Sequence, residues 1–167
     1  MKKTVIIVPK GEVLPDGVIS AYFFLSQANQ YLAGQGKAPA FELTLASHTK
    51  TSWLYEGHFG IRATPIQELP ASIDLIIVPG FIGEMAGPME ENSALILWMK
   101  KQHEEQQTEL ASMCTGAFLL AATGALNGKR CTTHWAFASA FSQNFPEARL
   151  RPERIVTDEG GTYTSAG

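Results

Sequence analysis

Cys114 stands between two apolar segments, in "ELASMCTGAFLLAATG", where a strand-to-helix turn is expected. A nucleophile held at such a turn needs small neighbours, and Ser112 and Gly116 lie two residues away on either side, as in the G-x-S-x-G pattern. A helix that begins at Thr115 or Gly116 would favour the thiolate over the thiol. The alternative is a cysteine that only fills space in the core, since free cysteine is among the most buried residue types. Spacing alone leaves both interpretations open.

Two further side chains are candidate partners of the thiol. His134, in "CTTHW", has the chemistry of the general base in a Cys–His pair. A lone histidine before a tryptophan is more often a packed or helix-capping side chain. Asp16, in the loop after the first predicted strand, is the most suitable carboxylate to share a proton with the thiol, and Glu12 is the second choice. Most acids in loops are merely solvated, so this pairing is a hypothesis.

A Pro-Gly turn in "VPGF", residues 78–81, ends the strand that precedes the cysteine segment. If the two strands are neighbours, the backbone amides of Phe81 and Thr115 converge on a developing oxyanion or a bound carboxylate. The simpler alternative is that Gly80 only ends a strand. The candidate ligand-binding residues at this turn are Phe81 and Thr115, with Gly80 and Gly116 beside them.

The remaining histidines and the second cysteine lack the spacing of metal ligands. His48, His58 and His103 are isolated from one another, and Cys131 is too far from Cys114 for a Cys-x-x-Cys motif. We therefore expect neither a metal nor a cofactor.

The composition is that of one globular domain. The chain has 167 residues, of which 45% are hydrophobic and 17% charged, so it is long enough for a substantial core and too apolar to be disordered. A net charge of -3 gives no basic footprint for nucleic acid. Two cysteines do not make a secreted disulfide framework, and no segment approaches the ~20 apolar residues of a membrane span. We expect a cytoplasmic protein that does not bind membranes.

Short apolar runs alternate with amphipathic segments along the chain. This alternation predicts an α/β fold, with a doubly wound and mostly parallel sheet flanked by helices. Two segments with central glycines add predicted β-hairpins. The expected strands cover residues 4–9, 41–47, 73–80 and 108–113, the expected helices 18–33 and 92–106, and the hairpins 52–64 and 154–167.

Four segments together resemble the ThiJ/PfpI superfamily, which has the flavodoxin-like, class I glutamine amidotransferase-like fold. They are "PKGEVLPDGV", "IIVPGF", "LASMCTGAFLLAATGALNGKRCTTHW" and "TYTSAG". The stretch from Trp98 to Ala136 is most similar to the N-terminal domain of AraC-type transcriptional regulators. The resemblance implies that Cys114 is the elbow cysteine, that His134 lies near it, and that Asp16 stands where many relatives keep a carboxylate against the thiol.

The sequence departs from the enzymatic relatives at three places. Residues 19–22, "ISAY", replace a Gly-Pro pair, and Gly80-Phe81 replaces a Gly-Gly turn, which is expected to put a large side chain at the pocket mouth. Trp135 follows His134 where some enzymes place an acid. Because a base without its orienting partner is a poorer base, these departures favour binding over hydrolysis.

Three functions remain open on the sequence. The favoured one is a sensing domain of a transcription regulator that binds an unknown small-molecule effector. The alternative is a stand-alone cysteine enzyme of the same superfamily, similar to isonitrile hydratase or to a glyoxalase. A thiol-based redox sensor is a weaker third hypothesis.

The resemblance also carries expectations about partners and about the rest of the protein. Residues 1–167 are expected to be a single domain that stops before its last helix, with a DNA-binding domain following Gly167. DNA would be contacted only through that further domain. A regulator's two-fold operator also leads us to expect a homodimer.

Overall fold

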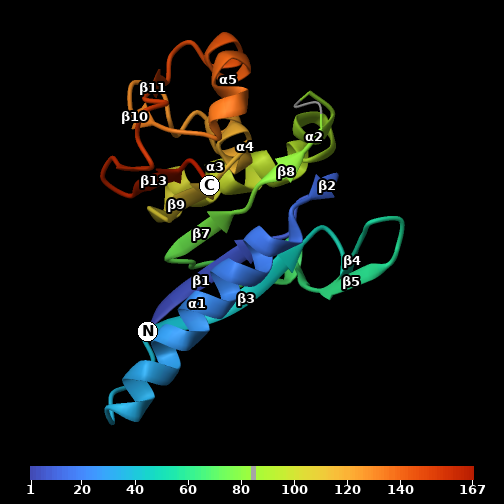
Figure 1. The fold of residues 1–167 in the computed structure, drawn as a ribbon. Coiled ribbons are helices and arrows are strands. Elements are labelled where there is room, and N and C mark those ends of the chain that lie inside the picture. Colours follow the sequence, from blue (N-terminus) through green and yellow to red (C-terminus); the bar gives the residue numbers. More distant parts are fainter. Residues whose placement is uncertain (84–85) are drawn as a thin grey trace.

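A seven-stranded sheet forms the centre of the computed structural model, which describes residues 1–83 and 86–167 (Figure 1). The strand order is β12-β13-β9-β7-β1-β3-β6, and every neighbouring pair is parallel except β12 with β13. The predicted doubly wound α/β fold is therefore confirmed. The strands are β1 (Lys2–Ile7), β3 (Phe41–Ser47), β6 (Thr64–Pro65), β7 (Leu75–Val78), β9 (Glu109–Met113), β12 (Val156–Asp158) and β13 (Thr162–Ser165).

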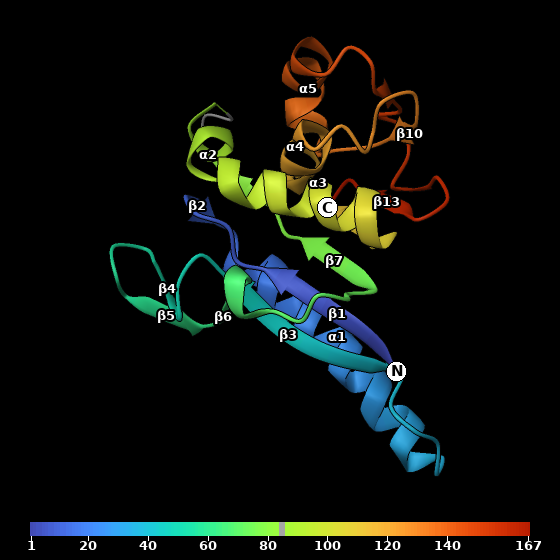
Figure 2. The same cartoon turned by 180° about the vertical axis from the view of Figure 1, so that it is seen from behind.

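Helices cover both faces of this sheet. Helix α1 (Pro15–Gly34) lies over β1 and β3 on one face, whereas α3 (Ser93–Gln106) and α4 (Gly116–Ala122) lie on the other, as Figures 1 and 2 show from opposite sides. The shorter helices are α2 (Ala86–Glu91), α5 (Ala138–Asn144) and the 3-10 turns η1 (Ile66–Glu68) and η2 (Trp135–Phe137).

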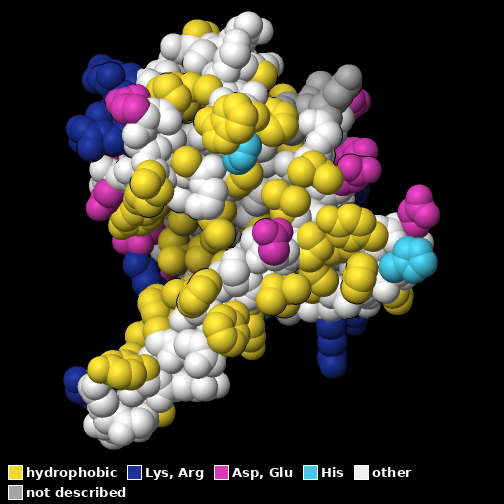
Figure 3. All heavy atoms as spheres, viewed as in Figure 1, with side chains coloured by type: hydrophobic (Ala, Val, Ile, Leu, Met, Phe, Trp, Pro, Cys, Tyr) yellow, Lys and Arg dark blue, Asp and Glu magenta, His cyan; other side chains and the backbone are white. Residues whose placement is uncertain are grey.

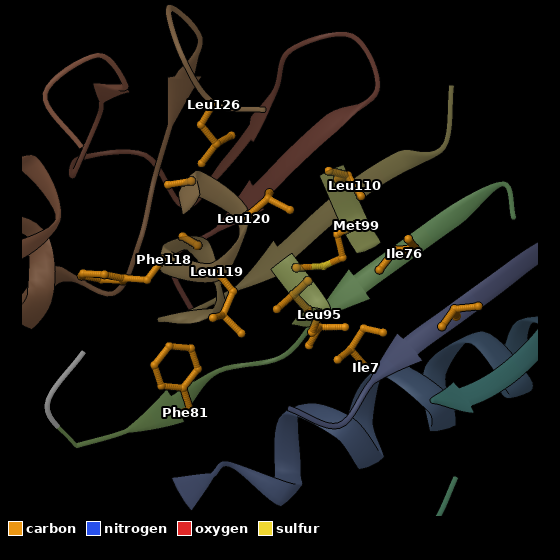
Figure 4. Packing of buried hydrophobic residues seen from close by; sticks show 14 of the residues in the cluster. Ile7, Ile76, Phe81, Leu95, Met99, Leu110, Phe118, Leu119, Leu120 and Leu126 are labelled. Atoms are coloured by element: carbon orange, nitrogen blue, oxygen red, sulfur yellow. The ribbon is translucent and has the colours of Figure 1, made fainter. Parts of the chain in front are cut away.

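Alternation along the strands divides the buried residues between two cores. On β1, Val5 and Ile7 pack on the side of α3 and α4, and Ile6 packs on the side of α1. The larger core lies on the α3 and α4 side (Figure 4). There the Phe118 ring of α4 meets the Phe141 ring of α5 edge-to-face, with 5.1 Å between centroids, which fixes α5 against α4.

Three small ladders surround the sheet. β2 (Glu12–Val13) pairs antiparallel with β8 (Phe81–Ile82), and β10 (Arg130–Cys131) pairs parallel with β11 (Arg149–Leu150). β4 (Thr51–Leu54) and β5 (Phe59–Arg62) form the hairpin predicted for residues 52–64. The hairpin predicted for residues 154–167 also forms, but its second strand, β13, joins the central sheet beside β9.

The elements begin and end close to their predicted limits. The helix predicted for residues 18–33 starts earlier, at Pro15, because proline suits the first turn of a helix. The strand predicted for residues 73–80 is shorter, since Pro79 and Gly80 leave the ladder after Val78. The helix predicted for residues 92–106 begins at Ser93, after the buried Asn92.

The α1 side of the sheet is only partly covered. A nearly wholly apolar groove of about 300 Å³ runs beside α1 over β7, β9 and β13, and its lining includes Phe24, Ile77, Met113 and Tyr163. Hydrophobic side chains also gather along the outer surface of α1 (Figure 3), where Phe23 and Phe24 are 51% and 68% exposed. Contiguous exposed apolar surface is a common feature of interaction sites.

Asn92 joins the loop after β1 to the helices at the end of the sheet. Its Oδ1 accepts a hydrogen bond from the Lys10 amide at 2.8 Å and one from His48 Nε2 at 3.3 Å, while its Nδ2 donates to the Lys10 carbonyl at 3.0 Å. Burial is the main cause that lowers the pKa of His48, the Lys10 charge adds to it, and the hydrogen bond with Asn92 opposes it. The neutral imidazole is therefore the favoured form, and it extends this network to the end of β3.

Candidate functional site

Cys114 occupies the sharp turn between β9 and α4. Its φ of 54° places it in the left-handed region, which costs a residue with a side chain about 1–2 kcal/mol. The side chain is half-buried. A positive φ at a partly accessible thiol is compatible with the predicted elbow, and backbone strain of this kind is concentrated at functional sites.

Two glycines make the turn possible. A Cβ on Gly116 would lie 2.3 Å from the Val78 carbonyl oxygen, and a Cβ on Gly80 would lie 2.9 Å from the Cys114 Cβ. Neither position has room for a side chain. The sequence predicts that the residues beside Cys114 must be small. The physical cause is that the end of β7 passes directly against the start of α4.

The backbone of Cys114 is held on both sides by contacts that the sequence did not indicate. Its amide donates to the Ser165 carbonyl at 2.9 Å, and its carbonyl accepts a hydrogen bond from Thr133 Oγ1 at 3.1 Å. Ser165 ends β13, which pairs with β9, and Thr133 immediately precedes His134. Local patterns carry no signal for either contact, because both join residues that are distant in the chain.

Thr115 and Phe81 tie the ends of β9 and β7 together. The Phe81 amide donates to Thr115 Oγ1 at 2.8 Å, and that hydroxyl donates to the Phe81 carbonyl. The Phe81 amide therefore already has a partner inside the protein. The sequence led us to expect that the Phe81 and Thr115 amides both face a bound oxyanion. For Phe81 this expectation is corrected, because its amide donates to Thr115 Oγ1 instead.

The Phe81 side chain also differs from expectation. It is fully buried and belongs to the larger core, where Figure 4 shows it close to Leu119, so it does not stand at the pocket mouth. The antiparallel pairing of β8 with β2 directs this ring inward, while the neighbouring Ile82 remains exposed. The wall directly beneath the thiol is Gly80.

His134 is the cap of a short helix in this structure. Its Nδ1 accepts a hydrogen bond from the Ala136 amide at 3.3 Å, and its ring stacks on the exposed Trp135. Because Nδ1 is the acceptor, a neutral ring carries its proton on Nε2 and presents a donor to any ligand. Among the described residues, no hydrogen bond joins His134 to the Cys114 thiol.

Asp16 lies in the first turn of α1, close to the elbow but exposed. The next residue, Gly17, packs against the Pro79–Gly80 turn, because a Cβ on it would lie 3.2 Å from the Pro79 Cβ. Within residues 1–83 and 86–167, Asp16 makes no hydrogen bond to Cys114. Glu12, the second candidate acid, is exposed on β2 and lines a different cavity.

Taken together, the site is a tightly built backbone turn with an unassisted thiol. The structure brings Gly80, Thr115 and Gly116 around Cys114 and places Asp16 and His134 on elements nearby. A nucleophile is commonly activated by a base within hydrogen-bond reach, and among the described residues no such contact to the thiol is formed. The arrangement suits binding of a small polar group or reaction of the thiol with an electrophile.

Neither a metal site nor a membrane span is found in the part of the chain that the structure describes. The described residues contain no group of three or more His, Cys, Asp or Glu side chains able to hold a metal ion. None of the described helices is both long enough and apolar enough to cross a membrane.

Comparison with known proteins identifies a family model and several relatives that match this chain. The model of the DJ-1/PfpI family matches residues 37–167. Isonitrile hydratase of Pseudomonas putida is 35% identical over 106 residues, which are 62% of this chain and 42% of the hydratase. The HTH-type transcriptional regulator CdhR of Pseudomonas aeruginosa is 36% identical over 74 residues, which are 44% of this chain and 21% of the regulator.

A solved structure supports the fold independently. The crystal structure of an AraC family transcriptional regulator from Pseudomonas putida superposes with a TM-score of 0.74, covering 100% of this chain and 84% of that chain at 18% identity. The chain matches less than half the length of the hydratase and about a fifth of the regulator CdhR.

The two cysteines should differ sharply in reactivity. Cys131 is fully buried, and burial raises the pKa of its thiol to about 11, whereas Cys114 is half-buried at the turn. Limited iodoacetamide labelling of the native chain near neutral pH, followed by peptide mass mapping, should therefore modify Cys114 first. Labelling in urea should modify both cysteines and serves as the control. Equal labelling of both in the native chain would contradict an accessible elbow thiol.

Proposed function

This chain belongs to the DJ-1/PfpI family, and from that premise we propose that it is the small-molecule-sensing domain of an AraC-type transcription regulator. The family assignment confirms the resemblance found in the sequence. In this proposal the effector binds at the elbow, against Gly80, Thr115, Gly116 and the Cys114 thiol. The domain itself catalyses little or nothing.

The unassisted thiol is the observation that carries this proposal. Cys114 has a positive φ and lies against Gly80 and Gly116, yet Nδ1 of His134 bonds to a backbone amide and Asp16 is exposed. A hydrolase needs its base hydrogen-bonded to the nucleophile, whereas a binding pocket needs only shape and a few polar groups. Geometry of this kind supports recognition more than turnover.

The apolar groove beside α1 supports a longer protein. We propose that a helix following β13 covers this groove in the full protein, and that a basic helix-turn-helix domain comes after that helix. The similarity to an HTH-type regulator over only part of that regulator's length supports such an organisation. DNA would then be bound outside residues 1–167, in keeping with their net charge of -3.

A cysteine enzyme is the second candidate. It is favoured by the 35% identity to isonitrile hydratase over 62% of this chain. In that case Cys114 would attack the substrate and His134 or Asp16 would move into contact with the thiol as the proton carrier. Catalytic contacts often tighten only when substrate binds, so this candidate deserves a direct assay.

The gene downstream of Gly167 and an activity assay together separate the two candidates. The regulator proposal predicts that the coding sequence continues with one helix and then about 100 basic residues containing two helix-turn-helix units. It also predicts that the full-length protein hydrates a simple alkyl isonitrile no faster than its Cys114→Ser variant. A stop codon shortly after one helix, together with turnover that the variant loses, would establish the enzyme instead.

We also propose that the protein is a homodimer that associates through the outer surface of α1. The exposed Ile19 and Phe23 side chains, which do not line the groove beside α1, offer an apolar surface for a symmetric contact. Light scattering should give a dimer for the parent chain and a monomer for Phe23→Glu. The control is Leu97→Glu, at a position 67% exposed on α3, which should stay dimeric. A parent chain that is monomeric at high micromolar concentration would overturn this proposal.

A further inference from the structure

A second cavity lies between the β4–β5 hairpin and the segment that contains β2. Its volume is about 510 Å³, which is the size of a site for a small organic molecule. Two aromatic and two acidic side chains dominate its wall. The side chains that the argument uses are Glu12, Val13, Trp53, Tyr55, Glu56 and His58.

The aromatic rings of this cavity are held in place by the hairpin. Trp53 is paired across the hairpin with Gly60, and a Cβ on Gly60 would lie 2.9 Å from Cζ3 of the indole. The indole therefore lies flat on the backbone of Gly60, while 67% of the residue remains exposed. Tyr55 packs edge-on against Phe59, with 6.1 Å between ring centroids. Both rings can meet a ligand without first being ordered.

Carboxylates make the same cavity negative. Glu12 and Glu56 line it together with His58, and among the described residues no lysine or arginine lines it and neither glutamate takes part in an ion pair. Tyr55 and Glu56 have φ of 50° and 55° at the hairpin turn, where glycine or asparagine is usual. Two residues with side chains that line the cavity thus occupy strained positions, as residues at ligand sites often do. Figure 3 shows hydrophobic and acidic side chains together over this end of the molecule.

We propose that this cavity binds a small organic cation, of the alkylammonium or guanidinium class. The faces of tryptophan and tyrosine attract a cation through the ring quadrupole, and the two carboxylates add charge complementarity. An anion would be repelled by Glu12 and Glu56, and a neutral molecule would gain no attraction from the two carboxylates.

The cavity is also connected to the elbow. Val13 pairs with Phe81, the Leu14 amide donates to the Gly80 carbonyl at 3.0 Å, and Gly80 lies directly beneath Cys114. A cation held by Glu12 therefore contacts the strand that supports the elbow. In this respect the inference deepens the proposed sensing function, although cation binding itself does not depend on that function.

Titration calorimetry of the purified chain with tetramethylammonium chloride tests the site, at constant ionic strength maintained with sodium chloride. The expected result is saturable binding of one cation per chain, with no saturable binding of the neutral isostere tert-butanol. Trp53→Leu, Glu12→Gln and Glu56→Gln should each weaken the binding about threefold or more. Glu42→Gln, at an exposed position on β3 outside the cavity, is the matched control and should bind like the parent.

Three outcomes would overturn the proposal. They are the absence of tetramethylammonium binding at tens of millimolar, equal binding of tert-butanol, and binding that survives unchanged in all three cavity variants. The glutamate variants alter exposed side chains, so loss of binding in a variant with parental thermal unfolding reports on the site and not on folding. None of these outcomes bears on DNA binding or on isonitrile turnover. The failure of the cation-binding proposal can therefore be distinguished from the failure of the proposed function.

Discussion

The close passage of the end of β7 against the start of α4 is the constraint on which the rest of the structure depends. At Gly116 the chain comes so near the Val78 carbonyl that a side chain cannot be accommodated, and at the same turn Cys114 adopts the left-handed conformation. The turn is maintained because β13 supplies the Ser165 carbonyl and Thr133 supplies a hydroxyl. The parallel pairing of β13 with β9 is therefore needed for the geometry of the thiol as well as for the sheet.

The same constraint explains why the site suits recognition. The polar groups nearby already have partners within the protein: Thr115 and Phe81 bond to each other, and Nδ1 of His134 caps η2. What remains is a half-buried thiol beside backbone, near the first turn of α1. A ligand can exploit that surface without the proton transfers that hydrolysis requires. The cavity at the hairpin is lined by Val13, which pairs with Phe81, and the next residue, Leu14, donates to the Gly80 carbonyl.

The elements and the elbow could be predicted from the sequence because their signals are local. Apolar runs define β1, β7 and β9, the glycines at 80 and 116 mark close approaches, and the glycine-containing turns mark both hairpins. The burial of Phe81 could not be predicted from the sequence, and neither could the hydrogen bonds that Thr133 and Ser165 make with the Cys114 backbone. Each depends on a contact with a distant part of the chain. The capping role of His134 was one of two alternatives, and spacing could not choose between them. The aromatic cavity likewise exists only once β2 and the hairpin are placed together.

We infer that Cys114 is kept at the turn at the expense of stability, for what its thiol can bind or react with. Urea unfolding of a Cys114→Gly variant measures that expense, because glycine adopts a positive φ without the penalty of about 1–2 kcal/mol. We expect this variant to be at least as stable as the parent, with a gain of up to about 1 kcal/mol after the greater flexibility of its unfolded chain is included. A variant less stable than the parent by more than about 1 kcal/mol would instead make Cys114 a packing residue of the core.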